Sequence, residues 1–214
     1  MQTETKPDIF EIMASTPKEA TELLWEELEK DNPDLQVIED ILAYSHIDVN
    51  LQDEDGWTAL MYAAHLGNDE SVGLLLNHPG IDVNIRNRWG ATALILATIW
   101  RWEDVIEVLL NHPGIDVNIQ DVEGYTALMR AAYYGSEKAV ELLLKQPGID
   151  VNARDENGQT ALIVAANGGR EKEVELLLKH PGIDVYVKNK SGWTAWNRAN
   201  GHVRQKFPQL NPNS

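Results

Sequence analysis

The chain has 214 residues, no cysteine, and 34 acidic against 18 basic residues, which gives a formal net charge of −16. The absence of cysteine excludes disulfides, thiolate nucleophiles and cysteine-ligated metal sites. The excess of negative charge opposes contact with phosphate backbones, so we expect no nucleic-acid partner.

The N-terminal sequence MQTETKPDIFEIMAS has no basic start followed by an apolar run, and no apolar run in the chain approaches the ~18 residues of a membrane span. We therefore expect no signal peptide and no membrane partner, and we expect an intracellular, cytoplasmic protein. The residues leave open whether a bacterium delivers the chain into a host cell.

Two helices are predicted before residue 46. In STPKEATELLWEELEK, Thr16 and Glu19 have the spacing of a capping box, and Pro17 suits the first helical position. An apolar stripe runs along this helix through Ala20, Leu23, Leu24 and Leu28. The second helix is predicted from NPDLQVIEDILAY and should start near Pro33. The many acids of these helices would give a stack of helices a soluble end.

From residue 47 onward, one pattern returns every 34 residues. The motif IDVN or IDVY begins at Ile47, Ile81, Ile115, Ile149 and Ile183. The motif TAL or TAW begins at Thr58, Thr92, Thr126, Thr160 and Thr194. Because two registers agree over five copies, we divide the chain into an N-terminal cap with a partial repeat (1–46), four full repeats (47–80, 81–114, 115–148 and 149–182) and a truncated C-terminal cap (183–214).

A single unit can be interpreted from its local signals. In the first full copy, Gly56 closes a polar turn, Thr58 caps the short helix ALMYAAH, and Gly67 ends that helix. DESVGLLLN is predicted to form a second helix, HPG turns the chain, and IDVN should run extended. One helix pair cannot bury its own apolar face, so the units are expected to stack side by side.

The last unit is expected to differ. TAWNRANGHVRQKF predicts a truncated copy whose second helix is missing or altered, and the final NPNS segment should fray. Charge is also uneven between the two ends. Residues 1–50 hold 13 acids and 3 bases, whereas residues 186–214 hold 5 bases and no acid.

The pattern D-x-x-G-x-T-A-L-x-x-A-A-x-x-G, followed by a leucine-rich helix and I-D-V-N, resembles the ankyrin repeat. The resemblance implies an all-α solenoid of L-shaped helix pairs with projecting β-hairpin loops, capped at both ends. It also implies a concave face built from the hairpins and the first helices. The chain departs from the family because alanine replaces the usual proline of T-P-L-H, and Met or Ile replaces the histidine.

No constellation typical of catalysis is present. His78, His112 and His180 recur in HPG but lie one or two repeats apart, and packed helices ~8–10 Å apart hold such rings too far from one another for one metal. There is no G-x-S-x-G, H-E-x-x-H or P-loop pattern. We therefore expect no catalytic residue, no metal and no cofactor.

An asparagine recurs in the motif IDVN of the four full copies. Asn50, Asn84, Asn118 and Asn152 are expected to make a side-chain hydrogen bond within the hairpin. The resemblance to ankyrin repeats also implies that such asparagines can be substrates of an asparaginyl hydroxylase.

Positions that differ between copies are the candidates for partner recognition. The resemblance places the hairpin tips and the ends of the first helices toward a partner, and aromatic residues and arginines gather there. Tryptophan, tyrosine and arginine carry most interface hot spots. The candidate partner-binding residues are Trp57, Arg86, Arg88, Trp89, Ile99, Trp100, Arg101, Tyr125, Tyr133, Tyr134 and Trp193. The open alternative is that these rings pack on neighbouring repeats.

The sequence IWRW interrupts the pattern, because Arg101 occupies the position of the helix-ending glycine. A left-handed conformation costs a non-glycine residue ~1 kcal/mol, so either the helix ends differently or a gain offsets this cost. We expect Trp100, Tyr133 and Tyr134 to form the centre of a contact patch. Trp102 is expected to pack at the start of the second helix.

These observations predict a non-enzymatic, monomeric module that binds a protein partner on its concave face. A second hypothesis is salt-dependent, head-to-tail self-association between the acidic N-terminal and basic C-terminal ends. A third, minor hypothesis is a small-ligand-binding or enzymatic groove.

Overall fold

The structure is a computed structural model that describes residues 16–211. Residues 1–15, in which we expect no signal peptide, lie outside the described residues. So do residues 212–214, which are part of the NPNS segment that we expect to fray.

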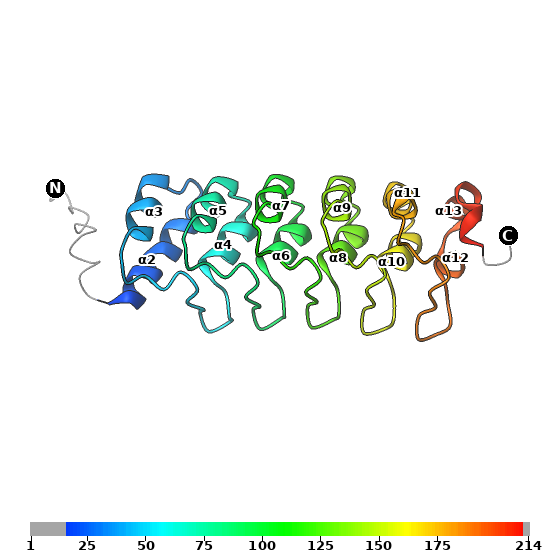
Figure 1. The fold of residues 1–214 in the computed structure, drawn as a ribbon, viewed down its shortest axis with the longest axis horizontal. Helices are drawn as coiled ribbons and strands as arrows, with labels where there is room; N and C mark the ends of the chain where they lie inside the picture. Colours follow the sequence, from blue (N-terminus) through cyan, green and yellow to red (C-terminus); the bar gives the residue numbers. More distant parts are fainter. Residues whose placement is uncertain (1–15, 212–214) are drawn as a thin grey trace.

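Twelve α-helices within residues 16–211 form six consecutive pairs along one row (Figure 1). The first helices of the pairs are α2 (Pro17–Leu28), α4 (Ala59–Leu66), α6 (Ala93–Trp100), α8 (Ala127–Tyr134), α10 (Ala161–Asn167) and α12 (Ala195–Arg198). The second helices are α3 (Leu35–Leu42), α5 (Asp69–Leu76), α7 (Glu103–Leu110), α9 (Glu137–Leu144), α11 (Glu171–Lys179) and α13 (Gly201–Lys206). A short 3-10 helix, Pro208–Leu210, follows. The predicted all-α solenoid is confirmed.

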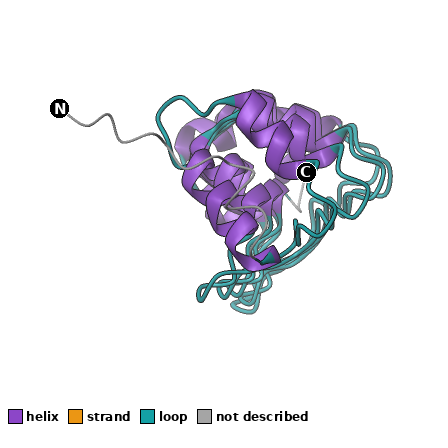
Figure 2. Ribbon diagram, turned by 90° about the vertical axis from the view of Figure 1, so that its left-hand side faces the viewer, coloured by secondary structure: helices purple, strands orange, loops and turns teal. Residues whose placement is uncertain are grey.

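The helices are arranged in two layers, which are visible when the stack is viewed from its end (Figure 2). Each first helix from α2 to α12 packs against the first helix of the next pair, and the second helices from α3 to α11 do the same. The loops that join successive pairs project from one edge of the row (Figure 1). Within residues 16–211 these loops contain turns but no β-strand.

The threonines of the TAL motif start the first helices, as predicted. Thr58 has extended backbone, and its hydroxyl oxygen accepts a hydrogen bond from the backbone N–H of Met61, 3.3 Å away. Thr92, Thr126 and Thr160 cap α6, α8 and α10 in the same way. A hydroxyl at this position satisfies one of the backbone donors that every helix start leaves free.

Alanine and leucine side chains fill the space between the layers. Ala63, Ala64, Val72 and Leu75 are completely buried, and Leu60 nearly so. The alanines are small enough for the next helix to approach closely, which lets identical units continue the same core along the row.

The recurring asparagines join neighbouring repeats instead of acting within one hairpin. The Asn50 amide Nδ2 donates to the Gly80 carbonyl at 2.7 Å, and its Oδ1 accepts from the Asp82 backbone N–H at 2.9 Å. Asn84, Asn118 and Asn152 repeat both bonds one unit further on. In the copy that begins at Ile183 the position is occupied by Tyr186.

The expectation that IDVN runs extended is wrong. The Asp48 carboxylate accepts from the Asn50 backbone N–H at 3.1 Å, and the Asp48 carbonyl accepts from the Leu51 N–H at 3.1 Å. The aspartate therefore folds the motif into a tight turn, as this residue type commonly does.

The two ends refine the predicted boundaries. Helix α3 starts at Leu35, later than expected, because the Asp34 carboxylate caps it by accepting from the N–H groups of Gln36 and Val37. At the other end the second helix is altered but present, since the Asn200 side chain accepts from Val203 N–H and starts α13.

Candidate functional site

Six aromatic rings from the first three pairs form a continuous group on the side of the first helices, which we call the tryptophan cluster. Its members are Trp25, Trp57, Tyr62, His65, Trp89 and Trp100. His65 lies between two tryptophans, with ring centroids 5.2 Å from Trp57 and 4.8 Å from Trp100, both edge to face. Trp57 also meets Trp89 at 6.5 Å. Such edge-to-face pairs stabilise one another beyond the area they bury.

His65 is half-buried between the rings of Trp57 and Trp100. Its Nδ1 is buried without a hydrogen-bond partner, and burial lowers the pKa of the imidazole below its usual value of 6.5. The neutral ring is therefore favoured in the folded protein, because partial burial reduces the hydration that would stabilise a charge.

Trp102 lies at the start of the second helix α7, where it was expected, and its ring packs on the preceding repeat. Its Nε1 donates to the His65 carbonyl at 2.8 Å, and its ring lies over Gly67, where an added Cβ would meet ring atoms at 2.5 Å. Gly67 has φ +80°, so both its backbone conformation and this contact require glycine. Trp102 leaves α7 without a side-chain cap, and its ring fastens two repeats together instead.

Arg101 adopts the left-handed conformation with φ 62°, and within residues 16–211 it is the only non-glycine residue with positive φ. Helix α6 therefore ends on a left-handed residue, as α4 and α8 do at Gly67 and Gly135. Within the described chain, no hydrogen bond or ion pair joins the exposed Arg101 guanidinium to another group, so no polar contact offsets the conformational cost.

Three tyrosines of the third full repeat form a second group, the tyrosine cluster. Tyr133 lies 5.1 Å from Tyr134 and 6.4 Å from Tyr125 between ring centroids, both nearly perpendicular. These rings line one side of a hollow of about 280 Å³. The other side comes from the next repeat: Gln159, Val164, Asn167, Gly168 and Arg170. The hollow is slightly smaller than the ~300–1,000 Å³ of most small-molecule pockets.

The side chains at one pair of positions differ between the two clusters. At the ends of the first helices, the second repeat carries Ile99 and Trp100, whereas the fourth carries Asn167 and Gly168. The Trp100 ring packs against His65 of the preceding repeat, while Gly168 leaves the space beside Tyr134 open. At the same position of the repeat, an aromatic side chain therefore covers the neighbouring repeat in one case, and a glycine leaves a hollow in the other.

The hairpin arginines have different environments. The Arg86 guanidinium donates to the carbonyls of Gly90 and, at 2.8 Å, Gln120, so it links two hairpins. Arg88 forms an ion pair with Asp55 of the preceding hairpin and lies over the Trp89 ring, 4.2 Å from its centroid. Arg88 is thus held against an aromatic surface that remains 43% exposed.

One arginine on the side of the first helices was not among the candidates named from the sequence. Arg130 on α8 lies 4.4 Å from the Tyr125 ring centroid and donates to the carboxylates of Asp121 and Glu123. Burial opposes the charge of Arg130, but the hydrogen bonds to the two carboxylates outweigh this effect and raise its pKa. Arg130 occupies the same position in its repeat as Tyr62, whose hydroxyl donates to Asp53 at 2.7 Å. A comparison of this position between the copies would have identified Arg130 as a candidate.

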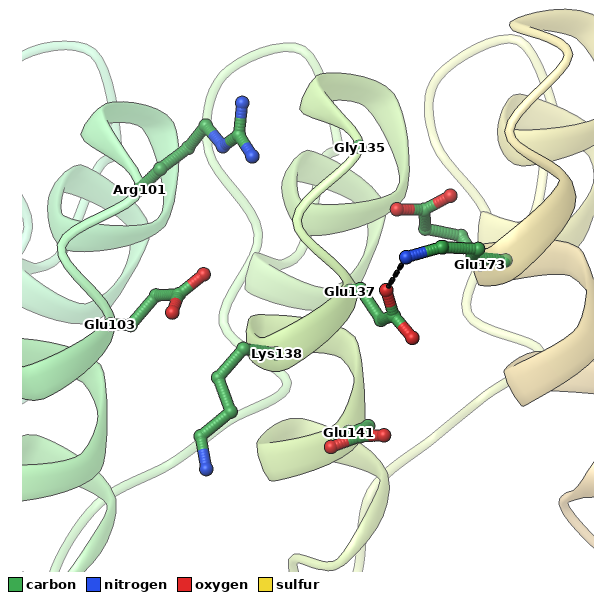
Figure 3. Close-up of a pocket in the computed structure, with 8 residues that line it drawn as sticks. Arg101, Glu103, Gly135, Glu137, Lys138, Glu141 and Glu173 are labelled. Atoms are coloured by element: carbon green, nitrogen blue, oxygen red, sulfur yellow. Dashed lines mark hydrogen bonds and ion pairs between the residues drawn. The ribbon is translucent and has the colours of Figure 1, made fainter.

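A hollow on the opposite, outer surface lies between the second helices (Figure 3). In it the Lys172 ammonium pairs with Glu137 of the preceding repeat, while Lys138 points away from this pair. The lining side chains are mostly charged, with no apolar floor. This arrangement is that of a solvated, charged surface.

The recurring histidines are turn residues, as the spacing predicts. Nδ1 of His78, His112 and His180 accepts a hydrogen bond from the backbone N–H of the glycine two residues later. Within the part of the chain that the structure describes, no three potential ligand side chains gather around one point.

A protein-family model described as ankyrin repeats (3 copies) matches residues 28–121, 80–155 and 128–204. The chain belongs to the ankyrin-repeat family. Ankyrin repeats are generally protein–protein interaction modules, and the family is typically non-enzymatic. No helix between residues 16 and 211 has both the length and the apolar character needed to cross a bilayer.

The ankyrin-repeat fold brings together some of the sequence candidates and separates others. Trp57, Trp89 and Trp100 belong to the tryptophan cluster, and Tyr125, Tyr133 and Tyr134 form the tyrosine cluster. No ring contact within the described residues joins Trp100 to the tyrosines. Trp193 lies apart on the last hairpin, and Trp57, Ile99 and Tyr125 are half-buried against the core.

Proposed function

We propose that this ankyrin-repeat protein acts as a non-enzymatic monomer that binds a protein partner on the face formed by its hairpins and first helices. The observation that carries the proposal is the open hollow beside Tyr133 and Tyr134, together with the exposed Trp100 ring on the same side of the helix stack. Tyr133 and Trp100 are each 53% exposed, although they are large rings that folding would normally bury.

The proposed contact has a centre and an edge. The tyrosine hollow takes a bulky side chain of the partner, and the tryptophan cluster supplies a second aromatic surface on the same face. The hairpin arginines contact the rim, where charges steer the encounter more than they add affinity. The rigid helix stack holds these groups in place, so little conformational freedom is lost on binding.

The test is a pull-down from a lysate of the source cell with tagged wild type and the double variant Trp100→Ala/Tyr134→Ala. We expect a protein that wild type retains and the double variant loses. Tyr186→Ala is the matched control, because this tyrosine is 57% exposed but lies in neither cluster. Circular dichroism on all three proteins checks that each remains folded.

Equal retention by the wild type and the double variant would contradict the proposed site. If neither captures a protein, the mass in solution at low and high salt tests head-to-tail self-association. A mass that falls with rising salt would replace the proposal by that alternative.

A further inference from the structure

The third full repeat and the truncated C-terminal copy, 183–214, which is the fifth repeat, each place an arginine over an aromatic ring at equivalent positions. Only the arginine of the third repeat has acidic partners. In the third repeat, Arg130 lies over Tyr125 and donates to Asp121 and Glu123. In the fifth repeat, Arg198 lies over Trp193, 4.8 Å from the ring centroid.

Both carboxylates are missing from the fifth repeat. Asn189 stands where the third repeat has Asp121, and Ser191 stands where it has Glu123. The Asn189 Oδ1 still makes the two turn bonds, accepting from Ser191 N–H at 3.0 Å and from Trp193 N–H at 2.9 Å. The hairpin therefore keeps its shape while the arginine loses its counter-charges.

Arg198 is left half-buried and unpaired. Its Nε is buried and has no hydrogen-bond partner, and no ion pair joins its guanidinium within residues 16–211. A guanidinium hydrogen-bonds a carboxylate with two parallel N–H groups, so an unpaired one next to a ring favours that ligand.

The surrounding charge is also positive. Lys188 and Lys190 are exposed on the same hairpin, and no acidic residue follows Asp184 in the chain. This end of the face is basic, although the whole chain has a formal net charge of −16. An acidic segment would be attracted here and repelled by the acidic N-terminal end.

We infer that Arg198, Trp193, Lys188 and Lys190 form a binding site for a carboxylate side chain in an acidic segment of a partner protein. The ligand carboxylate takes the place that Asp121 and Glu123 occupy around Arg130. The inference rests on the proposed function, because it assigns a partner chemistry to one end of the same face.

The test uses nuclear magnetic resonance of the full chain, observing the arginine Nε–H and tryptophan indole signals. The probe is the peptide Ac-Gly-Glu-Glu-Gly-NH2, with Ac-Gly-Gln-Gln-Gly-NH2 as the neutral control. We expect the glutamate peptide to shift the Arg198 and Trp193 signals with saturation. Arg130 is the internal control and should not respond, since its carboxylates are already in place.

The matched variant is Asn189→Asp/Ser191→Glu, which supplies within the chain the two carboxylates of the third repeat. We expect its apparent Kd for the glutamate peptide to rise at least tenfold. The exposed pair Lys188→Gln/Lys190→Gln serves as a second variant and should weaken binding about threefold.

An unchanged Arg198 signal, an equal response of Arg130, equal binding of the glutamine peptide, or undiminished binding by Asn189→Asp/Ser191→Glu would each overturn the inference. Arg198 shifts that depend on protein concentration without peptide would also overturn it, by assigning the carboxylate to a second copy. Trp100→Ala/Tyr134→Ala should keep the Arg198 response, so a failed pull-down and a failed carboxylate site give different results.

Discussion

The first two full repeats, 47–114, and the next two, 115–182, share a sequence pattern whose period is longer than one repeat. Alternate copies resemble each other most closely, as Met61 and Met129 alternate with Ile95 and Ile163. Tyr62 and Arg130 both donate to the hairpin aspartate of their own repeat, whereas Leu96 and Val164 are apolar. The 34-residue repeat thus builds the scaffold, and a 68-residue alternation organises its surface.

The two pairs nevertheless end in different surfaces. In 47–114 the rings of Trp100 and Trp102 contact the preceding repeat and cover it. In 115–182 the matching residues are Gly168 and Arg170, and a hollow remains open beside the tyrosines. The difference teaches that a few side chains on a constant backbone decide whether a repeat pair presents a wall or a cavity.

The largest expected effect is on the contact between repeats. Trp102→Ala removes the ring from Gly67 and the hydrogen bond to His65. Complete loss of a buried tryptophan costs about 3–5 kcal/mol, and since this ring is 41% exposed we expect a loss of about 2 kcal/mol in unfolding free energy. The matched change Arg170→Ala, in the second pair, should cost about 1 kcal/mol or less. Urea denaturation measures both, and equal losses would show that the two contacts are equivalent.

An intermediate effect on stability is expected at the left-handed residue that ends the first helix. Arg101→Gly relieves the backbone cost and should raise the unfolding free energy by about 1 kcal/mol. Gly135→Ala makes the opposite change in the second pair and should destabilise the fold, because its Cβ would also approach the Arg170 side chain at 3.0 Å. A destabilised Arg101→Gly variant would mean that the arginine side chain contributes more to the fold than its contacts indicate.

The smallest expected effect is a pH dependence of stability that arises from His65 in the first two full repeats. Burial lowers the pKa of His65 in the folded protein, while in the unfolded chain it returns to about 6.5. The contribution of His65 to stability is therefore complete above about pH 6.5 and is lost as the pH falls through the lower folded pKa. His65→Asn introduces the residue that the fourth repeat has at this position, Asn167, and removes this titration. Denaturation midpoints between pH 7.5 and pH 5 should fall less steeply for the variant, and parallel curves would contradict the assignment.

Much of the architecture was predictable because its causes are local. The threonine caps, the glycine helix ends and the HPG turns act within a few residues, so the helix pairs and their stacking followed from the 34-residue pattern. The turn in IDVN was not predicted, although the aspartate whose carboxylate stabilises it is part of the motif. The start of α3 was placed near Pro33 because the capping role of Asp34 went unrecognised.

The candidate site was predictable only in part, since its contacts cross repeat boundaries. The sequence placed Trp100 with Tyr133 and Tyr134, but the fold turns Trp100 toward His65. Arg130 and Arg198 went unnoticed, because their meaning depends on which carboxylates lie beside the same aromatic position.

The sequence by itself determined the repeat, the helix pairs, the caps and the absence of cysteine chemistry, because each depends on neighbouring residues or on composition. Only the tertiary structure decided which rings fill the face, where the hollow opens and which arginine lacks a counter-charge. The rings and the hollow depend on side chains from neighbouring repeats, and the packing of one repeat on the next sets their distances. The counter-charge of each arginine depends on how the hairpin of its own repeat folds back toward its first helix.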